Sequence, residues 1–385
     1  MSATPILDLE QEPPAGMRRW VVRSISVALG LLLGGALILH DEGLLGDWSV
    51  PFNGLLFFPA LLFAIAIHES GHALGGAAVG LKNGGMAVGP LLFWKGTTGW
   101  HFRFNWQCLM GGYYRPLADL NSFRPRAAAF MIACGPLADL SMVLVCAALL
   151  RQGVRSEWWG TLFCIECLLL ALNCIPYSTG SSKNDGARFR QLLFRPAEAR
   201  SWIALMELQT QDARGLKPAE YDDVAFQTAM EFVLEANEYW YCRYLAFYRS
   251  IDQGKPELAL LHLEDALSRS GRSGNAVQRV LYSEAAFAST ALLGKAEQAK
   301  VWRARAVRAQ KSPPLDAVDA AIAMAECRYA DALAFFEKAR LRVQQRKVDS
   351  GMVKFALAEW AIYEDRCREG LRKDEVGISA ENCRM

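Results

Sequence analysis

Long apolar runs dominate the first half of the chain, and polar or glycine-rich stretches separate them. A helix that spans a bilayer needs roughly 20 mainly apolar residues. Four runs approach or reach this length, so we predict four transmembrane helices, at residues 20–40, 53–79, 127–149 and 158–176. Residues 1–19 would form a tail before the first helix, and the membrane-embedded part would end near residue 195.

Residues 81–115 follow a different pattern. They are rich in glycine and aromatic residues, and their short apolar runs favour strands over a helix. We interpret them as a β-hairpin or re-entrant element beside the membrane domain. The predicted fold class is therefore an α-helical membrane protein with a small β-like membrane-associated element, followed by a soluble all-α repeat-like domain.

The second half of the chain contains a degenerate helical repeat. We expect residues 196–237 to form a helical connector and residues 238–385 to form a helical domain in the cytosol. Alanines recur at matching positions in three segments of this domain, at residues 254–266, 294–306 and 327–339. Small residues at fixed points let paired helices pack closely, so the segments resemble tetratricopeptide repeats. The alternative is a helical bundle whose alanines align by chance.

Charge is distributed unevenly along the chain. Residues 51–184 hold only nine of the 42 Lys and Arg residues and five of the 40 Asp and Glu residues. Arginines and lysines gather before the first and third predicted helices and after the fourth. The positive-inside rule then predicts a multi-pass protein of the cell membrane with both termini in the cytosol. The net charge of +2 excludes a partner bound by bulk charge, such as nucleic acid.

The second predicted helix contains His68-Glu69-Ser70-Gly71-His72, an HExxH motif. Residues four apart share a face of a helix, so both imidazoles can bind one metal ion, with Glu69 beside them to take a proton from water. A bound zinc ion lowers the pKa of its water to roughly 7. Two histidines and a glutamate are costly inside an apolar helix, and the chain has only five histidines. The motif therefore predicts a catalytic zinc site.

The motif leaves the third zinc ligand open. Ala78 stands where the metzincin pattern requires a histidine, and no glutamate lies between Glu69 and Glu157, which excludes the spacing of thermolysin-like enzymes.

The chain also carries an NxxP motif, from Asn173 to Pro176, followed by Asp185-Gly186. HExxH in one membrane helix with a later NxxP and DG resembles the site-2 protease family of intramembrane metalloproteases, over about residues 53–195. The resemblance implies three zinc ligands, one catalytic base and a set of residues that line the site. The ligands would be His68, His72 and Asp185, the base would be Glu69, and the lining residues would be Gly135, Pro136, Asp139, Asn173 and Pro176.

Two features depart from the family pattern. Pro176 and Asp185 are nine residues apart, whereas family members place this aspartate about five residues after the proline. Asp139 stands where the family usually has asparagine, and an aspartate within the membrane costs about 3 kcal/mol on insertion scales unless it is paired or protonated. Asp139 is therefore an alternative to Asp185 as the third ligand. Carboxylates usually close such a site from a loop or a helix terminus near the metal, which favours Asp185.

The predicted function is that of an intramembrane zinc endopeptidase with one zinc ion per chain. It would cleave in or near transmembrane segments of other membrane proteins during regulated intramembrane proteolysis. Its partners would be a membrane-protein substrate, the lipid bilayer and a protein bound by the C-terminal repeats. One alternative is a catalytically degenerate, membrane-anchored scaffold that acts through its repeats. A metal transporter that uses Asp139 and Glu166 is another, but transport does not require HExxH.

Overall fold

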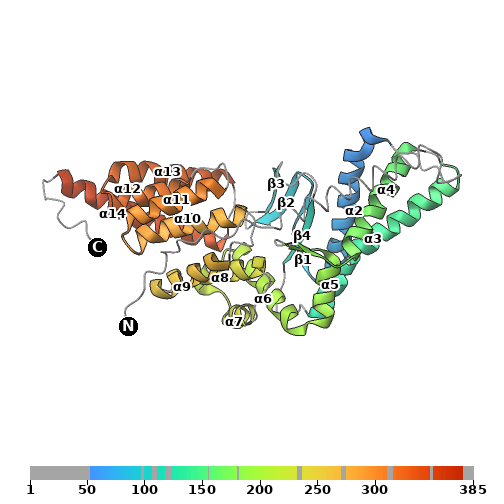
Figure 1. Cartoon of the computed structure of the whole chain (residues 1–385), viewed down its shortest axis with the longest axis horizontal. Coiled ribbons are helices and arrows are strands. Elements are labelled where there is room, and N and C mark those ends of the chain that lie inside the picture. The colour runs from blue at the N-terminus through green and yellow to red at the C-terminus, as the bar shows by residue number, and fades with distance from the viewer. Residues whose placement is uncertain are drawn as a thin grey trace. The chain divides into compact units, whose positions relative to one another are not determined.

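The computed structural model describes residues 53–96, 99–105, 111–117, 124–154, 156–179, 182–231, 236–269, 275–309, 315–346 and 350–375. The predicted helix at residues 20–40 and the predicted tail at residues 1–19 lie outside the described residues. The chain divides into two compact units at the boundary between Glu207 and Leu208, and Figure 1 labels the helices and strands of both. Each unit has its own hydrophobic core.

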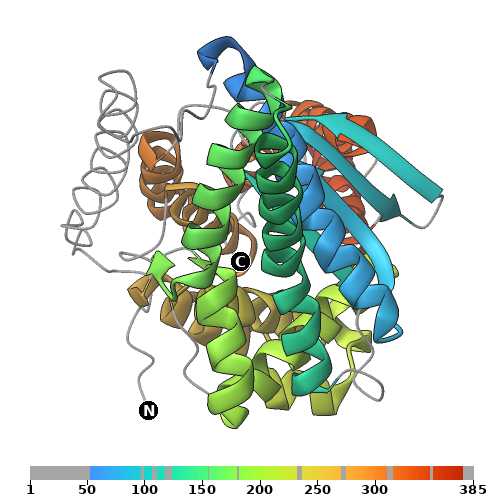
Figure 2. The same cartoon turned by 90° about the vertical axis from the view of Figure 1, so that its right-hand side faces the viewer.

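Three helical segments of the first unit are long and apolar enough to cross a membrane. They are formed by η1 (Gly54–Leu56) with α2 (Phe57–Ala78), by α3 (Pro125–Arg151) and by α4 (Glu157–Cys174). They correspond to three of the four predicted transmembrane helices. Pro125 starts α3, where a missing N–H group costs nothing, and α3 continues through Pro136. Figure 2 shows α2, α3 and α4 side by side.

Glycines on α2 bring α2 and α3 close together. A Cβ atom at Gly71 would lie 2.3 Å from the carbonyl oxygen of Cys134, and one at Gly75 would lie 2.6 Å from the Sγ atom of Cys134. Small residues four apart are typical of helix interfaces in membranes, because they let the backbones approach. The HExxH segment of α2 is therefore held against the middle of α3.

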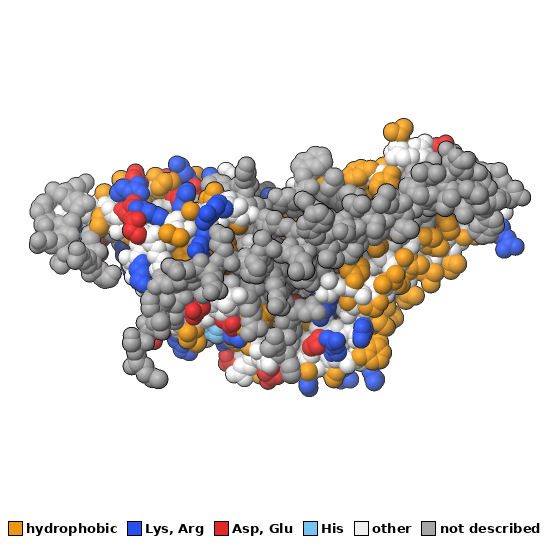
Figure 3. All heavy atoms as spheres, viewed as in Figure 1, with side chains coloured by type: hydrophobic (Ala, Val, Ile, Leu, Met, Phe, Trp, Pro, Cys, Tyr) orange, Lys and Arg blue, Asp and Glu red, His pale blue; other side chains and the backbone are white. Residues whose placement is uncertain are grey.

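The outer faces of these helices are apolar. Four leucines on them are more than half exposed: Leu55, Leu74, Leu137 and Leu144. Figure 3 shows hydrophobic side chains gathered over the helices at the right of the view. An extended apolar surface of this kind suits contact with lipid and is unusual for a soluble domain.

The predicted β-like element is a four-stranded antiparallel sheet. Its strands are β1 (Lys82–Val88), β2 (Leu91–Gly96), β3 (Gly99–Phe104) and β4 (Gly112–Leu117), in the order β3-β2-β1-β4. Strand β4 therefore lies at one edge of the sheet. It packs against α2, where a Cβ atom at Gly76 would lie 3.0 Å from the hydroxyl oxygen of Tyr114.

A short hairpin follows α4. Its strands, β5 (Ser178–Thr179) and β6 (Ser182–Lys183), pair in antiparallel fashion, and α5 (Asp185–Phe194) begins two residues later. The hairpin explains the long spacing between Pro176 and Asp185, because it takes up the extra residues between them. Helix α6 (Pro196–Ala213) begins in the first unit and ends in the second.

The second unit is helical throughout its described residues. After η3 (Pro218–Glu220), its helices are α7 (Asp223–Met230), α8 (Ala236–Asp252), α9 (Pro256–Arg269), α10 (Asn275–Ala291), α11 (Ala296–Ala309), α12 (Asp316–Ala325), α13 (Tyr329–Arg346) and α14 (Gly351–Glu375). Helices α8, α10 and α12 each pack against the next helix in the chain, and α10 also packs against α12. The aligned alanines of the predicted repeats are all buried: Ala259, Ala266, Ala299, Ala306, Ala332 and Ala339.

Candidate metal centre

The HExxH side chains are buried on α2. The exposed fractions are 7% for His68, 5% for Glu69 and 6% for His72. Helix α2 is continuous through the motif, so the two histidines lie about one turn apart on one face. Their rings meet edge to face, with the centroids 4.7 Å apart. Burial of three such polar groups costs free energy unless they are paired or bind a metal.

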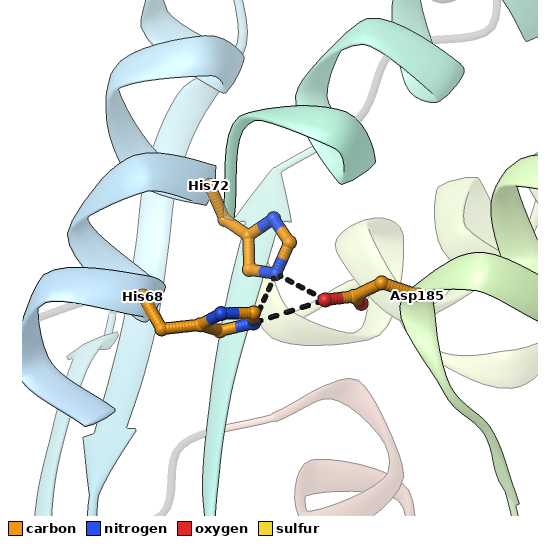
Figure 4. A group of neighbouring side chains, drawn as sticks. All are labelled: His68, His72 and Asp185. Atoms are coloured by element: carbon orange, nitrogen blue, oxygen red, sulfur yellow. Dashed lines mark hydrogen bonds and ion pairs between the residues drawn. The ribbon is translucent and has the colours of Figure 1, made fainter. Parts of the chain in front are cut away.

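Asp185 joins the two imidazoles from the first residue of α5 (Figure 4). Its Oδ2 atom lies 2.9 Å from Nε2 of His68 and 3.3 Å from Nε2 of His72, and the two Nε2 atoms are 3.1 Å apart. One donor atom from each residue lies within 4.8 Å of the other two, so the group could hold a metal ion. Two imidazoles and one carboxylate are a donor set typical of catalytic zinc.

The other nitrogen of each ring has a partner on α3. Nδ1 of His68 lies 2.8 Å from Oδ2 of Asp139, and Nδ1 of His72 lies 3.0 Å from the carbonyl oxygen of Met131. Contacts of this kind fix the orientation of an imidazole that binds metal through its other nitrogen. The two candidate aspartates therefore contact different nitrogens: Asp139 contacts Nδ1 of His68, whereas Asp185 lies near both Nε2 atoms.

Asn184 ties the start of α5 to the end of α4. Its Oδ1 atom accepts a hydrogen bond of 3.0 Å from the backbone N–H of Ala187, and its Nδ2 atom donates to the carbonyl oxygens of Leu172 and Ile175 at 2.6 and 2.7 Å. These bonds position the next residue, Asp185. The sequence reasoning missed Asn184, although an asparagine just before a helix is a common N-cap.

Three glycines bring backbone close to the site. A Cβ atom at Gly135 would lie 2.5 Å from Cε1 of His72, and one at Gly112 would lie 2.5 Å from Oε1 of Glu69. One at Gly186 would lie 2.5 Å from a carbonyl oxygen at the end of α4. The structure thus places the predicted Gly135 against an imidazole. Gly112, the first residue of β4, was missed, because nothing in its local sequence relates it to Glu69.

The remaining predicted lining residues lie in two places. Pro136 follows Gly135 within α3. Asn173 is half-buried in the last turn of α4, and its carbonyl oxygen lies 3.4 Å from Nδ2 of Asn184. Pro176 follows α4 and is exposed. Asn173 and Pro176 therefore belong to the α4–α5 junction.

Oε2 of Glu69 is buried and has no hydrogen-bond partner within the described residues, whereas the buried Oδ2 of Asp185 contacts the Nε2 atoms of both histidines. Burial by itself would raise the pKa of the Asp185 carboxyl, but its contacts with the two imidazoles outweigh burial and lower this pKa to about 2. The carboxyl is therefore ionised, which is the form that binds metal. The ionised carboxylate and the adjacent ring nitrogens fit a divalent cation.

Comparison with known proteins identified one matching family. The model for peptidase family M50 matches residues 56–345, which is well over half of the chain. The matched range contains the HExxH motif, the sheet, α3, α4 and Asp185. No curated protein and no solved structure gave a significant match.

Proposed function

We propose that the chain, which belongs to peptidase family M50, is an intramembrane zinc endopeptidase. Family membership indicates a membrane metalloprotease like the site-2 proteases. Our finer proposal is that it hydrolyses peptide bonds in or near transmembrane segments of other membrane proteins, in regulated intramembrane proteolysis. The observation that carries it is the convergence of His68, His72 and Asp185 next to Glu69, among helices apolar enough to cross a membrane.

In this proposal His68, His72 and Asp185 bind one zinc ion per chain. Support comes from the position of the Asp185 carboxylate near both Nε2 atoms, while Asp139 and the backbone of α3 occupy the Nδ1 atoms. Asp139 would then orient His68 and strengthen it as a ligand. When bound, zinc would polarise the scissile carbonyl and increase the acidity of water at the site.

Glu69 is the proposed general base and general acid. It adjoins His68 in the chain, it is buried, and its Oε2 atom has no competing hydrogen bond among the described residues. A carboxylate so placed can accept the proton of the attacking water and deliver it to the leaving amine. The surrounding apolar helices exclude bulk water, which strengthens the electrostatic effects within the site.

We further propose that the substrate binds as an added strand along β4. This strand lies at the edge of the sheet, and its first residue, Gly112, lies beside Glu69. A helical substrate must unwind locally before a peptide bond can be cleaved, and strand addition would hold the unwound segment extended. The remaining sides of the site would be lined by Gly135, Pro136, Asn173 and Pro176.

The second unit is proposed to bind a protein partner as a tetratricopeptide-like domain in the cytosol. The packing of α8, α10 and α12 on their following helices supports this, as do the buried alanines at matching positions. The charge distribution supports a multi-pass protein of the cell membrane with both termini in the cytosol.

The experiment compares purified wild-type protein with Glu69→Gln. We expect about one zinc ion per chain in both, because Glu69 is not a proposed ligand. Membrane proteins that accumulate in cells carrying Glu69→Gln would be the substrates. Glu337→Gln, which changes an exposed glutamate on α13, is the control and should behave as wild type.

Two results would contradict the peptidase proposal. One is a purified protein without zinc. The other is an unchanged set of membrane proteins in Glu69→Gln cells; if deletion of residues 238–345 alone removed the biological output, the scaffold interpretation would replace ours.

A further inference from the structure

We propose that a cavity in the second unit binds an arginine side chain of a peptide. The cavity has a volume of about 340 Å³, at the lower end of the range of roughly 300–1,000 Å³ for ligand pockets. Residues of α8, α10, α12, α13 and α14 line it. None of the lining residues belongs to the candidate metal centre, so peptide binding in the cavity would not depend on the peptidase activity.

Aromatic side chains form much of the cavity wall: Phe247, Tyr248, Phe287, Phe355, Trp360 and Tyr363. Ring contacts across the helices hold this wall in place. Tyr248 and Phe355 meet with their centroids 5.8 Å apart, and Phe287 and Tyr363 with theirs 5.7 Å apart. Aromatic faces attract cations, and arginine is the side chain that stacks on them most often.

The charged groups of the cavity are mostly carboxylates. Glu284 on α10, Asp316 on α12 and Glu359 on α14 line it, together with one cation, Arg342 on α13. Arg342 already pairs with Asp316, at 2.7 Å. Glu284 and Glu359 are therefore left without a lysine or arginine among the residues that line the cavity.

Glu284 is recessed among protein atoms, but its side chain retains partial exposure. Burial raises the pKa of Glu284 to about 7, although hydrogen bonds from Tyr248 and Tyr244 act in the opposite direction. Such a carboxyl gains from a bound cation, because the cation stabilises its ionised form.

Glu359 is half-buried, and its nearby charged groups oppose each other. Burial raises the pKa of Glu359, Asp252 raises it further, and Arg366 acts in the opposite direction. Glu284 and Glu359 thus leave the cavity with two carboxylates that a ligand could neutralise. A guanidinium group can hydrogen-bond to carboxylates through its edge and stack on aromatic rings through its face. Apolar residues on either side of the arginine would contact the rest of the wall.

The test measures peptide binding to the full-length chain in detergent. The probe is the capped, fluorescently labelled heptapeptide Gly-Ser-Leu-Arg-Leu-Ser-Gly, and its partner carries neutral citrulline in place of arginine. By fluorescence anisotropy, we expect the arginine peptide to bind at least about tenfold more tightly, because charge-assisted hydrogen bonds are the strong ones. Glu284→Gln and Glu359→Gln should each remove most of this preference, while Glu337→Gln should leave it unchanged.

A folding defect cannot produce the peptide preference, because the citrulline comparison uses unaltered protein. The two glutamine variants also preserve side-chain size and some hydrogen bonding. Equal affinity for the two peptides would overturn the inference, as would failure of both to bind at millimolar concentration. Retention of the full arginine preference in both glutamine variants would overturn it as well.

Discussion

Gly135→Ala should weaken the candidate metal centre without changing a proposed ligand. The added Cβ atom would lie 2.5 Å from Cε1 and 2.6 Å from Nε2 of His72, and 2.9 Å from Cε1 of His68. Ordinary contacts between carbon atoms are roughly 3.5–4.0 Å. Neither imidazole can turn away freely, because Asp139 and the backbone of Met131 hold the Nδ1 atoms.

The expected loss follows from the cost of overpacking. An extra methyl group in a tightly packed interior costs roughly 1–3 kcal/mol. If this cost falls on the imidazoles, zinc affinity should decrease about 5- to 150-fold. The helix itself should not suffer, because alanine favours a helix over glycine by about 1 kcal/mol. The effect should therefore appear in metal binding more than in folding.

The assay titrates purified full-length protein with zinc against a competing chelator. Gly54→Ala is the matched control, because a Cβ atom there would meet nothing within 4 Å among the described residues. We expect its zinc affinity to equal that of the wild type. A wild-type zinc affinity in Gly135→Ala would contradict this prediction, because it would mean that α3 does not lie against the imidazoles at this point.

Three further predictions concern an outer contact, a helix cap and a buried acid. Asp139→Asn should weaken zinc binding about 10- to 100-fold in the same titration, because it alters only the contact with Nδ1 of His68 and leaves the proposed ligands in place. Asp185→Ala should abolish zinc binding, because it removes a proposed ligand. Asn184→Ala should lower the free energy of unfolding by about 0.5–2 kcal/mol through loss of the N-cap and should also weaken zinc binding, as thermal unfolding and the titration would measure. Burial raises the pKa of Glu284 from an ordinary 4.5 to about 7, so the folded state keeps a proton that the unfolded state has lost within this range. The free energy of unfolding should therefore fall by up to about 3 kcal/mol between pH 4.5 and 7, and Glu284→Gln should remove this decrease in circular dichroism melts.

Each of these predictions has a contrary result. A greater loss of zinc in Asp139→Asn than in Asp185→Ala would reverse the proposed ligand assignment. Wild-type unfolding and zinc binding in Asn184→Ala would show that the cap does not position α5. If the free energy of unfolding depended on pH in Glu284→Gln as it does in the wild type, a group other than Glu284 would cause the decrease.

Much of the local chemistry of this protein follows from its amino-acid order alone. Apolar runs of sufficient length predicted the three described segments that are long and apolar enough to cross a membrane, because bilayer thickness sets helix length. The spacing of His68 and His72 placed both imidazoles on one face, because it matches the period of the helix. Glycine, aromatic residues and short apolar runs likewise predicted a β-like element at residues 81–115, which the structure shows as a four-stranded sheet.

The packing of separate elements sets which distant residues meet at these local features. Asp139 and Asp185 were both candidate ligands in the sequence, and the packing of α3 and α5 brought one to Nδ1 of His68 and the other to both Nε2 atoms. No local sequence pattern predicts that Gly112 approaches Glu69. Nor does one predict that Glu284 and Glu359 line the same cavity. Local patterns cannot reveal such contacts, because helix period and hydrophobicity act over a few neighbouring residues, whereas these contacts depend on how separate elements pack.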